Sequence, residues 1–327
     1  MQTITKYPLS ISYRRAKEKY GSHSVFKSKL TNADHEFLNS NKLQGNFTLK
    51  QIYNILYKTS LYNSLRKGLR EELSLKVAIT LFSLFMIGII TMMTSYTKLG
   101  IGIFALLFVS AIISIGIVTS ITEYSKFQLE NEIALKGIIY ALMKDFGPKQ
   151  KVYINLNFNE IEQSKVNLLK KYQAGAKKIK VYNKHLFTLK LNVGEHMKLQ
   201  LEDQFFLKVQ NWKTTNRRAG RVKTKYKSKE KGVHKLYYKV LLDSRHYTIA
   251  DNENRLHFNQ MYIERHQTFE NKVFELKEGM WEHKSKFKIR EVEESDINEL
   301  LDEVLEHLQQ PFLQIKTKES WQLANKK

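Results

Sequence analysis

The sequence predicts an α+β membrane protein in which a two-helix transmembrane hairpin precedes a cytoplasmic antiparallel β domain and a C-terminal amphipathic helix. Three observations support this fold class. Residues 77–122 are apolar and carry a single charge, Lys98. Residues 150–250 contain short runs in which apolar and polar side chains alternate, the pattern of half-buried strands. Residues 294–309 place apolar side chains at helical spacing, between Ser295 as a cap and Pro311 as a terminator.

The apolar segment divides into two runs, each long enough to cross a bilayer. Residues 77–97 give 21 uncharged residues and residues 99–122 give 24, against the roughly 20 that a spanning helix needs. The turn at residues 95–98 is too short for anything but an antiparallel pair. The alternative is a pair of buried helices in a soluble protein, but such helices usually keep a polar stripe, and neither run has one.

The distribution of cations around the two runs predicts the topology. One cation, Lys98, lies in the turn, whereas the flanks are basic. The flanking cations are Lys58, Arg66, Lys67, Arg70 and Lys76 before the first run, and Lys126 and Lys136 after the second. The positive-inside rule then predicts a multi-pass membrane protein with both termini in the cytoplasm.

The chain divides into four segments. Residues 1–47 are predicted to be a basic N-terminal arm with one short helix. Residues 48–146 form the helical membrane domain, in which an amphipathic helix leads into the first span and the second span continues unbroken to Gly147. Residues 150–250 form the basic β domain, a barrel or a sandwich with an inserted helix at residues 160–172. Residues 251–327 combine an irregular segment at residues 251–290 with the acidic C-terminal helix.

Composition favours an anionic partner and gives little support for catalysis. The 327 residues include 54 Lys plus Arg against 32 Asp plus Glu, a net charge of +22 that favours phosphate-bearing partners. The absence of Cys excludes disulfides, a thiolate nucleophile and a cysteine zinc site. No phosphate-binding loop, dinucleotide fingerprint, zinc-protease motif or serine-hydrolase elbow is present. We therefore expect a protein that is not an enzyme and that carries no cofactor and no metal.

The ten His are scattered, and their most economical interpretation is as surface or core residues. The Gly194-Glu195-His196 stretch fits a hairpin turn. Asp243, Arg245 and His246 fit either an ordinary polar turn or the lining of a pocket at a strand end. A metal site would require several His to converge in space, which spacing alone does not indicate.

The strongest candidate site is a basic comb over residues 217–231. The candidate anion-binding residues are Arg217, Arg218, Arg221, Lys223, Lys225, Lys227, Lys229 and Lys231. Residues two apart on a strand share a face, so the comb would present cations about 7 Å apart, close to the phosphate spacing of a nucleic-acid strand. Trp212, Tyr226, Tyr237 and Tyr238 would offer nearby aromatic surfaces for base stacking.

Several interpretations of the comb remain open. It could be a solvated edge strand, a mobile loop, or a surface held near anionic lipid headgroups at roughly 1 kcal/mol per cation. Lipid headgroups are the default anion because the domain is tethered to a membrane, and a nucleic acid or nucleotide is the more demanding alternative. Residues 291–306 contain eight acids and no base. We therefore hypothesise that this acidic helix docks near the comb and competes with an external polyanion.

The leading functional prediction is an integral inner-membrane protein whose β domain binds an anionic ligand or partner and whose hairpin serves as anchor. Small residues four apart, Ser110 with Ser114 and Gly116 with Ser120, favour association of the helices and hence a homo-oligomer. The alternative is an oligomerising pore-forming or membrane-disrupting effector of a bacterial defence or stress system. The layout resembles the membrane effectors of bacterial antiviral signalling systems, and this resemblance assigns no function to individual residues.

Overall fold

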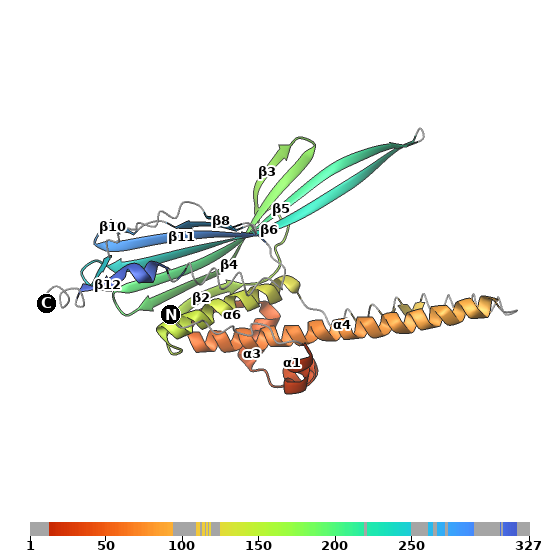
Figure 1. Cartoon of the computed structure of the whole chain (residues 1–327), viewed down its shortest axis with the longest axis horizontal. Helices are drawn as coiled ribbons and strands as arrows, with labels where there is room; N and C mark the ends of the chain where they lie inside the picture. Colours follow the sequence, from red (N-terminus) through yellow and green to blue (C-terminus); the bar gives the residue numbers. More distant parts are fainter. Residues whose placement is uncertain are drawn as a thin grey trace. The chain divides into compact units, whose positions relative to one another are not determined.

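The protein is an α+β chain that divides into two compact units (Figure 1). The computed structural model describes residues 13–93, 109–111, 113, 114, 116, 118, 125–218, 221–249, 261–263, 267–271, 274–290, 308 and 310–318. The first unit contains residues 1–35 and 56–133, and the second contains residues 36–55 and 134–327. Each unit is therefore built from two separated stretches of the chain.

The first unit begins with short helices that contact the long helix α4 (Leu49–Met93). They are α1 (Tyr13–Tyr20), α2 (His23–Lys27) and the first turn of α3 (Asn32–Ser40). The Tyr13 hydroxyl and Lys17 Nζ each lie 2.9 Å from Glu72 of α4. The expected N-terminal arm with one short helix is therefore too simple, because this segment buries Ala16 and Phe26 within the folded unit.

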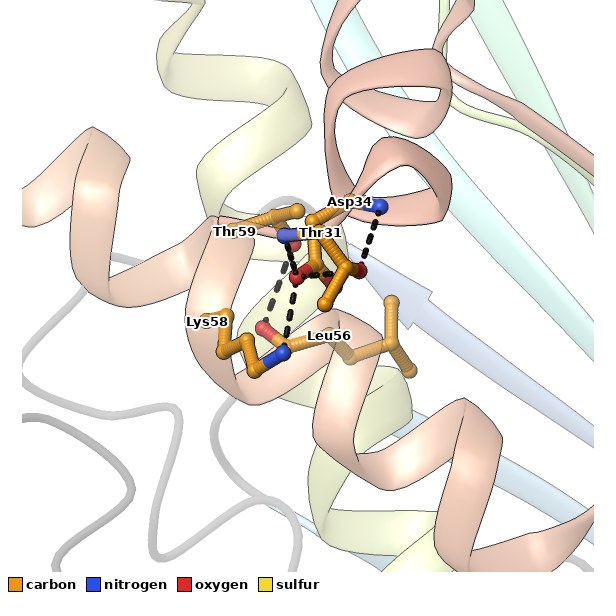
Figure 2. A network of polar contacts seen from close by, with 5 residues as sticks. All are labelled: Thr31, Asp34, Leu56, Lys58 and Thr59. Carbon is orange, nitrogen blue, oxygen red and sulfur yellow. Dashed lines mark hydrogen bonds and ion pairs between the residues drawn. The ribbon is translucent and has the colours of Figure 1, made fainter. Parts of the chain in front are cut away.

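A capping box starts α3 and links it to α4 (Figure 2). The Thr31 amide and hydroxyl donate to Asp34 Oδ2 at 2.8 and 2.7 Å, and the Asp34 amide donates to the Thr31 hydroxyl at 3.4 Å. Lys58 Nζ of α4 donates to the same carboxylate oxygen at 2.8 Å. Asp34 is 1% exposed, so these hydrogen bonds offset the cost of burying its carboxylate.

Helix α4 combines a buried half with an apolar half that has almost no cover. A second capping box starts it, since the Thr48 amide donates to Gln51 Oε1 at 2.8 Å and the Gln51 amide donates to the Thr48 hydroxyl at 3.2 Å. Leu49, Ile52 and Leu65 are buried near its start. From Leu75 onward most of its large hydrophobic side chains are exposed: Leu75, Ile79, Phe82, Leu84, Phe85, Met86, Ile87 and Ile90.

Among the residues that the structure describes, one helix is long and apolar enough to cross a membrane. Within Leu49–Thr91, an 18-residue window reaches a mean hydropathy of 2.2, and 6% of that window is buried. The amphipathic helix predicted from Thr48 and the first predicted span are thus one continuous helix. The second predicted span, residues 99–122, falls mostly outside the described residues, and the positions described there, such as Val109 and Ser110, are helical.

The expected unbroken helix from the second span to Gly147 is wrong at Ser125. Ser125 is not helical, and it caps α6 (Lys126–Phe146). Its hydroxyl accepts from the Gln128 amide at 3.2 Å, and its carbonyl accepts from the Leu129 amide at 3.1 Å. A serine cap starts a helix at this point because its side chain satisfies an amide that has no partner within the helix. Gly147, at φ 86°, ends α6.

The second unit is built on a ten-stranded antiparallel sheet in the order β1-β2-β4-β5-β6-β11-β9-β8, with β3 paired to β4 and β10 to β11. The strands are β1 (Lys42–Thr48), β2 (Lys151–Asn157), β3 (Leu168–Ala174), β4 (Lys177–Val193), β5 (Met197–Arg218), β6 (Arg221–Asp243), β8 (Met261–Ile263), β9 (Gln267–Asn271), β10 (Glu275–Lys277) and β11 (Met280–Arg290). A second sheet pairs β7 (Tyr247–Ile249) with β12 (Ile315–Thr317), just after the 3-10 helix η2 (Gln310–Gln314).

The described strands form an open sheet, so the expected barrel or sandwich is not what they show. Alternate residues of β5 and β6, such as Leu199, Leu201 and Tyr238, are buried on one face. Ile138 and Leu142 of α6 line a small cavity together with these residues. A helix therefore covers the apolar face, and no second large sheet is needed to bury it.

Two other expectations for this region are wrong. The segment 160–172 holds no inserted helix, and its second half belongs to β3. Val166 is 93% exposed and Leu169 is 53% exposed, so a helix here would have had no apolar face to bury. The segment 251–290, expected to be irregular, contributes β8, β9, β10 and β11 to the main sheet.

Helices α4 and α6 join the sheet at adjacent points. β1 leads directly into α4, α6 leads into β2, and β1 pairs with β2 from Lys42↔Asn157 to Thr48↔Lys151. The amides of Leu49 and Lys50 donate to the carbonyls of Gln150 and Pro148 at 3.0 and 3.1 Å. The chain therefore leaves and re-enters the sheet domain at one place.

The β5–β6 hairpin extends past its neighbours (Figure 1). β4 pairs with β5 as far as Asn211, and β11 pairs with β6 as far as Val233. Beyond these points, residues 212–218 of β5 pair only with β6 among the described strands. Residues 221–232 of β6 likewise pair only with β5. This two-stranded ribbon carries the basic comb.

Candidate functional site

The second face of the sheet, opposite the buried one, is strongly cationic. Side chains alternate along each strand, and directly paired residues share a face. Lys208 pairs with Lys231, Lys239 with Lys284, and Lys235 with Lys288, so cations from β5, β6 and β11 gather on one side. We call this surface the cationic face: Lys208, Lys225, Lys227, Lys229, Lys231, Lys235, Lys239, Lys284, Lys286 and Lys288.

The comb forms the outer end of this face. Lys225, Lys227, Lys229 and Lys231, the comb lysines, are all exposed along β6 and lie on one side of the ribbon. Residues two apart on a strand are separated by about 7 Å, the spacing expected from the sequence. Arg217, Arg218, Arg221 and Lys223 belong to the same two strands, and their side chains lie outside the described part. Arg218 and Arg221 pair at the end of the ribbon.

The aromatic residues expected near the comb are divided between the two faces. Trp212 pairs with Lys227 and so shares the side of the comb lysines, and Lys177 Nζ lies 5.5 Å from its ring centre. Tyr226 pairs with Lys213 on the other side, where Lys213 Nζ lies 5.1 Å from its ring centre. Tyr238 is 2% exposed on the buried face. A stacking role for Tyr226 or Tyr238 beside the comb is therefore excluded by their positions.

A groove of about 530 Å³ lies at the inner end of the cationic face. Lys239, Lys284 and Lys286 line it, together with Gln200, Glu202 and Gln204 of β5. Its lining combines cations with amide and carboxylate groups and with the Tyr237 ring, so it offers both polar and apolar surface to a ligand.

Glu282 restrains two of the groove lysines. Its carboxylate lies 2.6 Å from Lys239 Nζ and 2.9 Å from Lys284 Nζ. Hydrogen bonds from Lys239 and Lys284 lower the pKa of Glu282 to about 2. Part of the positive charge of the groove is therefore neutralised from within the protein.

A second polar cluster lies at one end of the sheet, where two turns meet. His196 directly precedes β5. Asp243 is the last residue of β6, and His246 lies in the turn that follows it. His196 Nδ1 lies 4.0 Å from Asp243 Oδ2, and the His196 and His246 rings stack with centres 3.6 Å apart. The three residues could hold a metal ion, because their ligand atoms all lie within 4.8 Å of one another.

Arg245 binds the carboxylate of this cluster from the outside. Its Nε lies 3.1 Å from Asp243 Oδ1, and one terminal nitrogen lies 2.7 Å from Asp243 Oδ2. These hydrogen bonds hold the pKa of Asp243 well below its usual range. The Arg245 side chain is 83% exposed, so this guanidinium lies at the surface.

Buried Tyr238 and exposed Asp145 lie on the other face of the sheet, at the same cavity. Tyr238 and Asp145 line a cavity of about 20 Å³ between α6 and the strands, large enough for about one water molecule. Desolvation raises the pKa of both side chains. The Tyr238 hydroxyl is buried without a hydrogen-bond partner among the described residues.

Sequence reasoning found the comb but missed its continuation and the His cluster. The run Lys284-Ser285-Lys286-Phe287-Lys288 has the same two-residue spacing as the comb, and that signal could have placed β11 on the cationic face. The two turns holding His196 and Asp243 were noted separately, since no local pattern brings them together. The acidic segment 291–306, expected to dock near the comb, lies outside the described residues.

No protein-family model, curated protein or solved structure matches this chain. The function must therefore be inferred from its own sites.

Proposed function

We propose that this chain is an integral inner-membrane protein whose cytoplasmic sheet domain binds phosphate-bearing anions, with lipid headgroups as the primary source. The cationic face is the observation that carries the proposal. The exposed half of α4 and the apolar run at residues 99–122 would serve as the anchor. The proposal assigns no enzymatic role.

The exposed half of α4 supports the membrane anchor. Eight large apolar side chains between Leu75 and Ile90 are exposed. A soluble helix with such a surface would be a severe aggregation liability, whereas lipid tails would cover it at no cost. The hydroxyls of Thr80 and Ser83 donate to the carbonyls of Lys76 and Ile79, so they would need no water inside a bilayer.

The β1–β2 pair supports a hairpin rather than a single crossing. Because these strands pair with each other, the chain must leave and re-enter the sheet domain on one side of the membrane. An even number of crossings is then required between Thr48 and Lys151. Helix α4 would supply one, and the apolar run at residues 99–122 would supply the return.

The arrangement of charge supports an extended anionic surface as ligand. The comb lysines lie in one plane of a ribbon, and Trp212 lies among them. An amphipathic Trp ring beside a row of Lys is typical of contact with the interfacial region of a bilayer. Each lysine near an anionic bilayer contributes up to about 1 kcal/mol.

The test uses the full chain in phosphatidylcholine nanodiscs and measures its co-flotation with added vesicles. The vesicles contain phosphatidylcholine with or without phosphatidylglycerol, and fluorescence anisotropy measures binding of single-stranded RNA and DNA in parallel. In the test variant the four comb lysines are changed to Ser. In a matched control, four exposed lysines outside the cationic face are changed to Ser: Lys165, Lys171, Lys178 and Lys213.

We expect salt-sensitive binding to phosphatidylglycerol vesicles that the comb variant loses by at least about tenfold and the control retains. Tighter binding to oligonucleotides than to vesicles would overturn the lipid assignment in favour of nucleic acid. Equal loss in both variants would show that net charge, rather than the comb, governs binding. No binding to any of these polyanions would overturn the proposal.

A further inference from the structure

We propose that His196, Asp243 and His246 bind one divalent transition-metal ion, with Zn²⁺ the best match. The site lies at one end of the main sheet, where the β4–β5 turn meets the chain that leaves β6. It is separate from the comb and independent of the proposed function.

The ligand set fits this class of ion. Two imidazoles and one carboxylate are the ligands that Zn²⁺ accepts, with a water in the fourth position. Imidazole nitrogens also suit Co²⁺ and Ni²⁺, whereas Mg²⁺ and Ca²⁺ take oxygen ligands. The rings of His196 and His246 stack with centres 3.6 Å apart and an interplanar angle of 18°, so both imidazoles lie beside the Asp243 carboxylate.

The distances are within reach of coordination. The three ligand atoms lie within 4.8 Å of one another. Ligand bonds of about 2.0 to 2.2 Å place tetrahedral ligands about 3.3 to 3.6 Å apart. His246 is exposed and His196 is 38% exposed, so these side chains have room to unstack and turn their ring nitrogens towards one ion.

The backbone holds the ligands in register before any ion binds. Met197 pairs with Leu242, and the Asp243 amide donates to the His196 carbonyl at 2.9 Å. The His246 amide donates to the Asp243 carbonyl at 3.1 Å. The Arg245 amide donates to Asp243 Oδ1 at 2.9 Å, which fixes the direction of the carboxylate. A preorganised site of this kind loses little conformational entropy on binding.

Arg245 acts as a competitor for the carboxylate. Its guanidinium contacts both oxygens of Asp243, and a metal ion would have to displace it from at least one. Because the Arg245 side chain is 83% exposed, it can leave into solvent at little cost. Removing the guanidinium should therefore tighten metal binding, whereas a purely structural His-Asp contact would not respond in this way.

The experiment titrates Zn²⁺ into the chelator-treated full chain in detergent micelles, after removal of any affinity tag, by isothermal titration calorimetry. Co²⁺ is titrated in parallel, because its visible absorption reports coordination geometry. The variants are His196→Ala, His246→Ala and Arg245→Gln. The matched control is His185→Ala, which removes an imidazole from β4 that bonds Thr188 at 2.7 Å, outside the cluster.

We expect one Zn²⁺ per chain in the wild type and in the His185 variant, with a tetrahedral Co²⁺ spectrum. Each cluster His variant should lose at least about a hundredfold in affinity, since even outer-shell ligands are worth about 10- to 100-fold. Arg245→Gln should bind more tightly than the wild type. Binding that survives both cluster variants, or no stoichiometric binding by the wild type, would overturn the site. Weaker binding by Arg245→Gln would overturn the competitor role. Unchanged thermal melting of the apo variants shows that they are folded.

Discussion

Gly68 of α4 lies directly beneath Tyr13 of α1, so close that a Cβ on Gly68 would overlap the Tyr13 side chain. The atoms that it would meet are Cβ, Cγ and Cδ2 of Tyr13, near the α1 backbone. The ring therefore cannot rotate away without moving the helix. The Tyr13 hydroxyl continues this contact by donating to Glu72 one turn further along α4.

Gly68→Ala is expected to destabilise the packing of α1, even though Ala stabilises a helix interior by about 1 kcal/mol relative to Gly. Limited trypsin digestion of the full chain in micelles should show faster cleavage at Arg14 and Arg15. In a Tyr13→Ala background, Gly68→Ala should leave the rate of cleavage unchanged or lower it, because the Tyr13 side chain no longer clashes with the new Cβ. Equal effects in both backgrounds would contradict the close approach.

Asp34→Ala is expected to lower the free energy of unfolding of the first unit by about 2 to 3 kcal/mol. The change removes the α3 capping box and leaves Lys58, whose side chain is 33% exposed, without its carboxylate partner. Chemical denaturation in micelles measures the effect. Glu36→Ala, on an exposed position of the same helix, removes the same charge and should cost less than about 0.5 kcal/mol.

Glu282→Gln is expected to increase affinity for phosphatidylglycerol vesicles about fivefold, because the change removes one negative charge worth about 1 kcal/mol near the bilayer. It also releases Lys239 and Lys284 from their ion pairs. Glu230→Gln, on the opposite face of β6, is the control with the same change in charge. Equal gains in both variants would show that Glu282 does not restrain the groove.

The effect of Glu282→Gln on stability is expected to depend on pH. The folded pKa of Glu282 is about 2, below its ordinary value of 4.5, so its ionised form stabilises the folded state above pH 4.5. The stability of the wild type relative to Glu282→Gln should therefore shrink as the pH falls from 4.5 towards 2. A constant difference across this interval would contradict the ion pairs.

Tyr238→Phe is expected to raise the free energy of unfolding by about 1 kcal/mol, since a buried hydroxyl without a partner carries a desolvation penalty. The aromatic ring and its packing against α6 stay in place. Tyr238→Ala provides the contrast and should cost about 3 to 5 kcal/mol. A loss of stability in the Phe variant would show instead that a water in the small cavity joins the hydroxyl to Asp145.

Phe82→Lys combined with Ile90→Lys is expected to abolish stable membrane integration. Both side chains are at least 60% exposed on α4, and a Lys near the centre of a spanning helix costs about 2.5 to 3.5 kcal/mol. Alkaline extraction of membranes should release the variant and retain the wild type. Val25→Lys, an exposed apolar position on α2, is the control.

The sequence was sufficient for features that depend on local periodicity. The apolar run of α4 and the alternating strands of residues 150–250 are local signals, and the structure confirms a long apolar helix and an antiparallel sheet. The sequence was not sufficient to predict which strands pair with each other. β6 pairs with β11 across an intervening segment, and β1 pairs with β2 across the whole helical excursion. Nothing in a short window encodes such pairings.

The His cluster shows the same limit at the scale of a site. His196 and Asp243 are adjacent because Met197 pairs with Leu242, and that register is set by the whole length of β5 and β6. Each turn reads as an ordinary polar turn by itself. The incorrect prediction of a helix at residues 160–172 has a local cause. Leu168 and Leu169 occur at a spacing compatible with either a helix or a strand.

The β1–β2 pair also sets an order of events during synthesis. β1 emerges from the ribosome early, and its pairing strand follows only after α4 and α6 have been translated. The apolar half of α4 is therefore available to the membrane before the edge of the sheet can close. Because β2 is made only after both helices, β1 stays unpaired while they are synthesised. Delayed delivery to the membrane would lengthen the time for which β1 is unpaired.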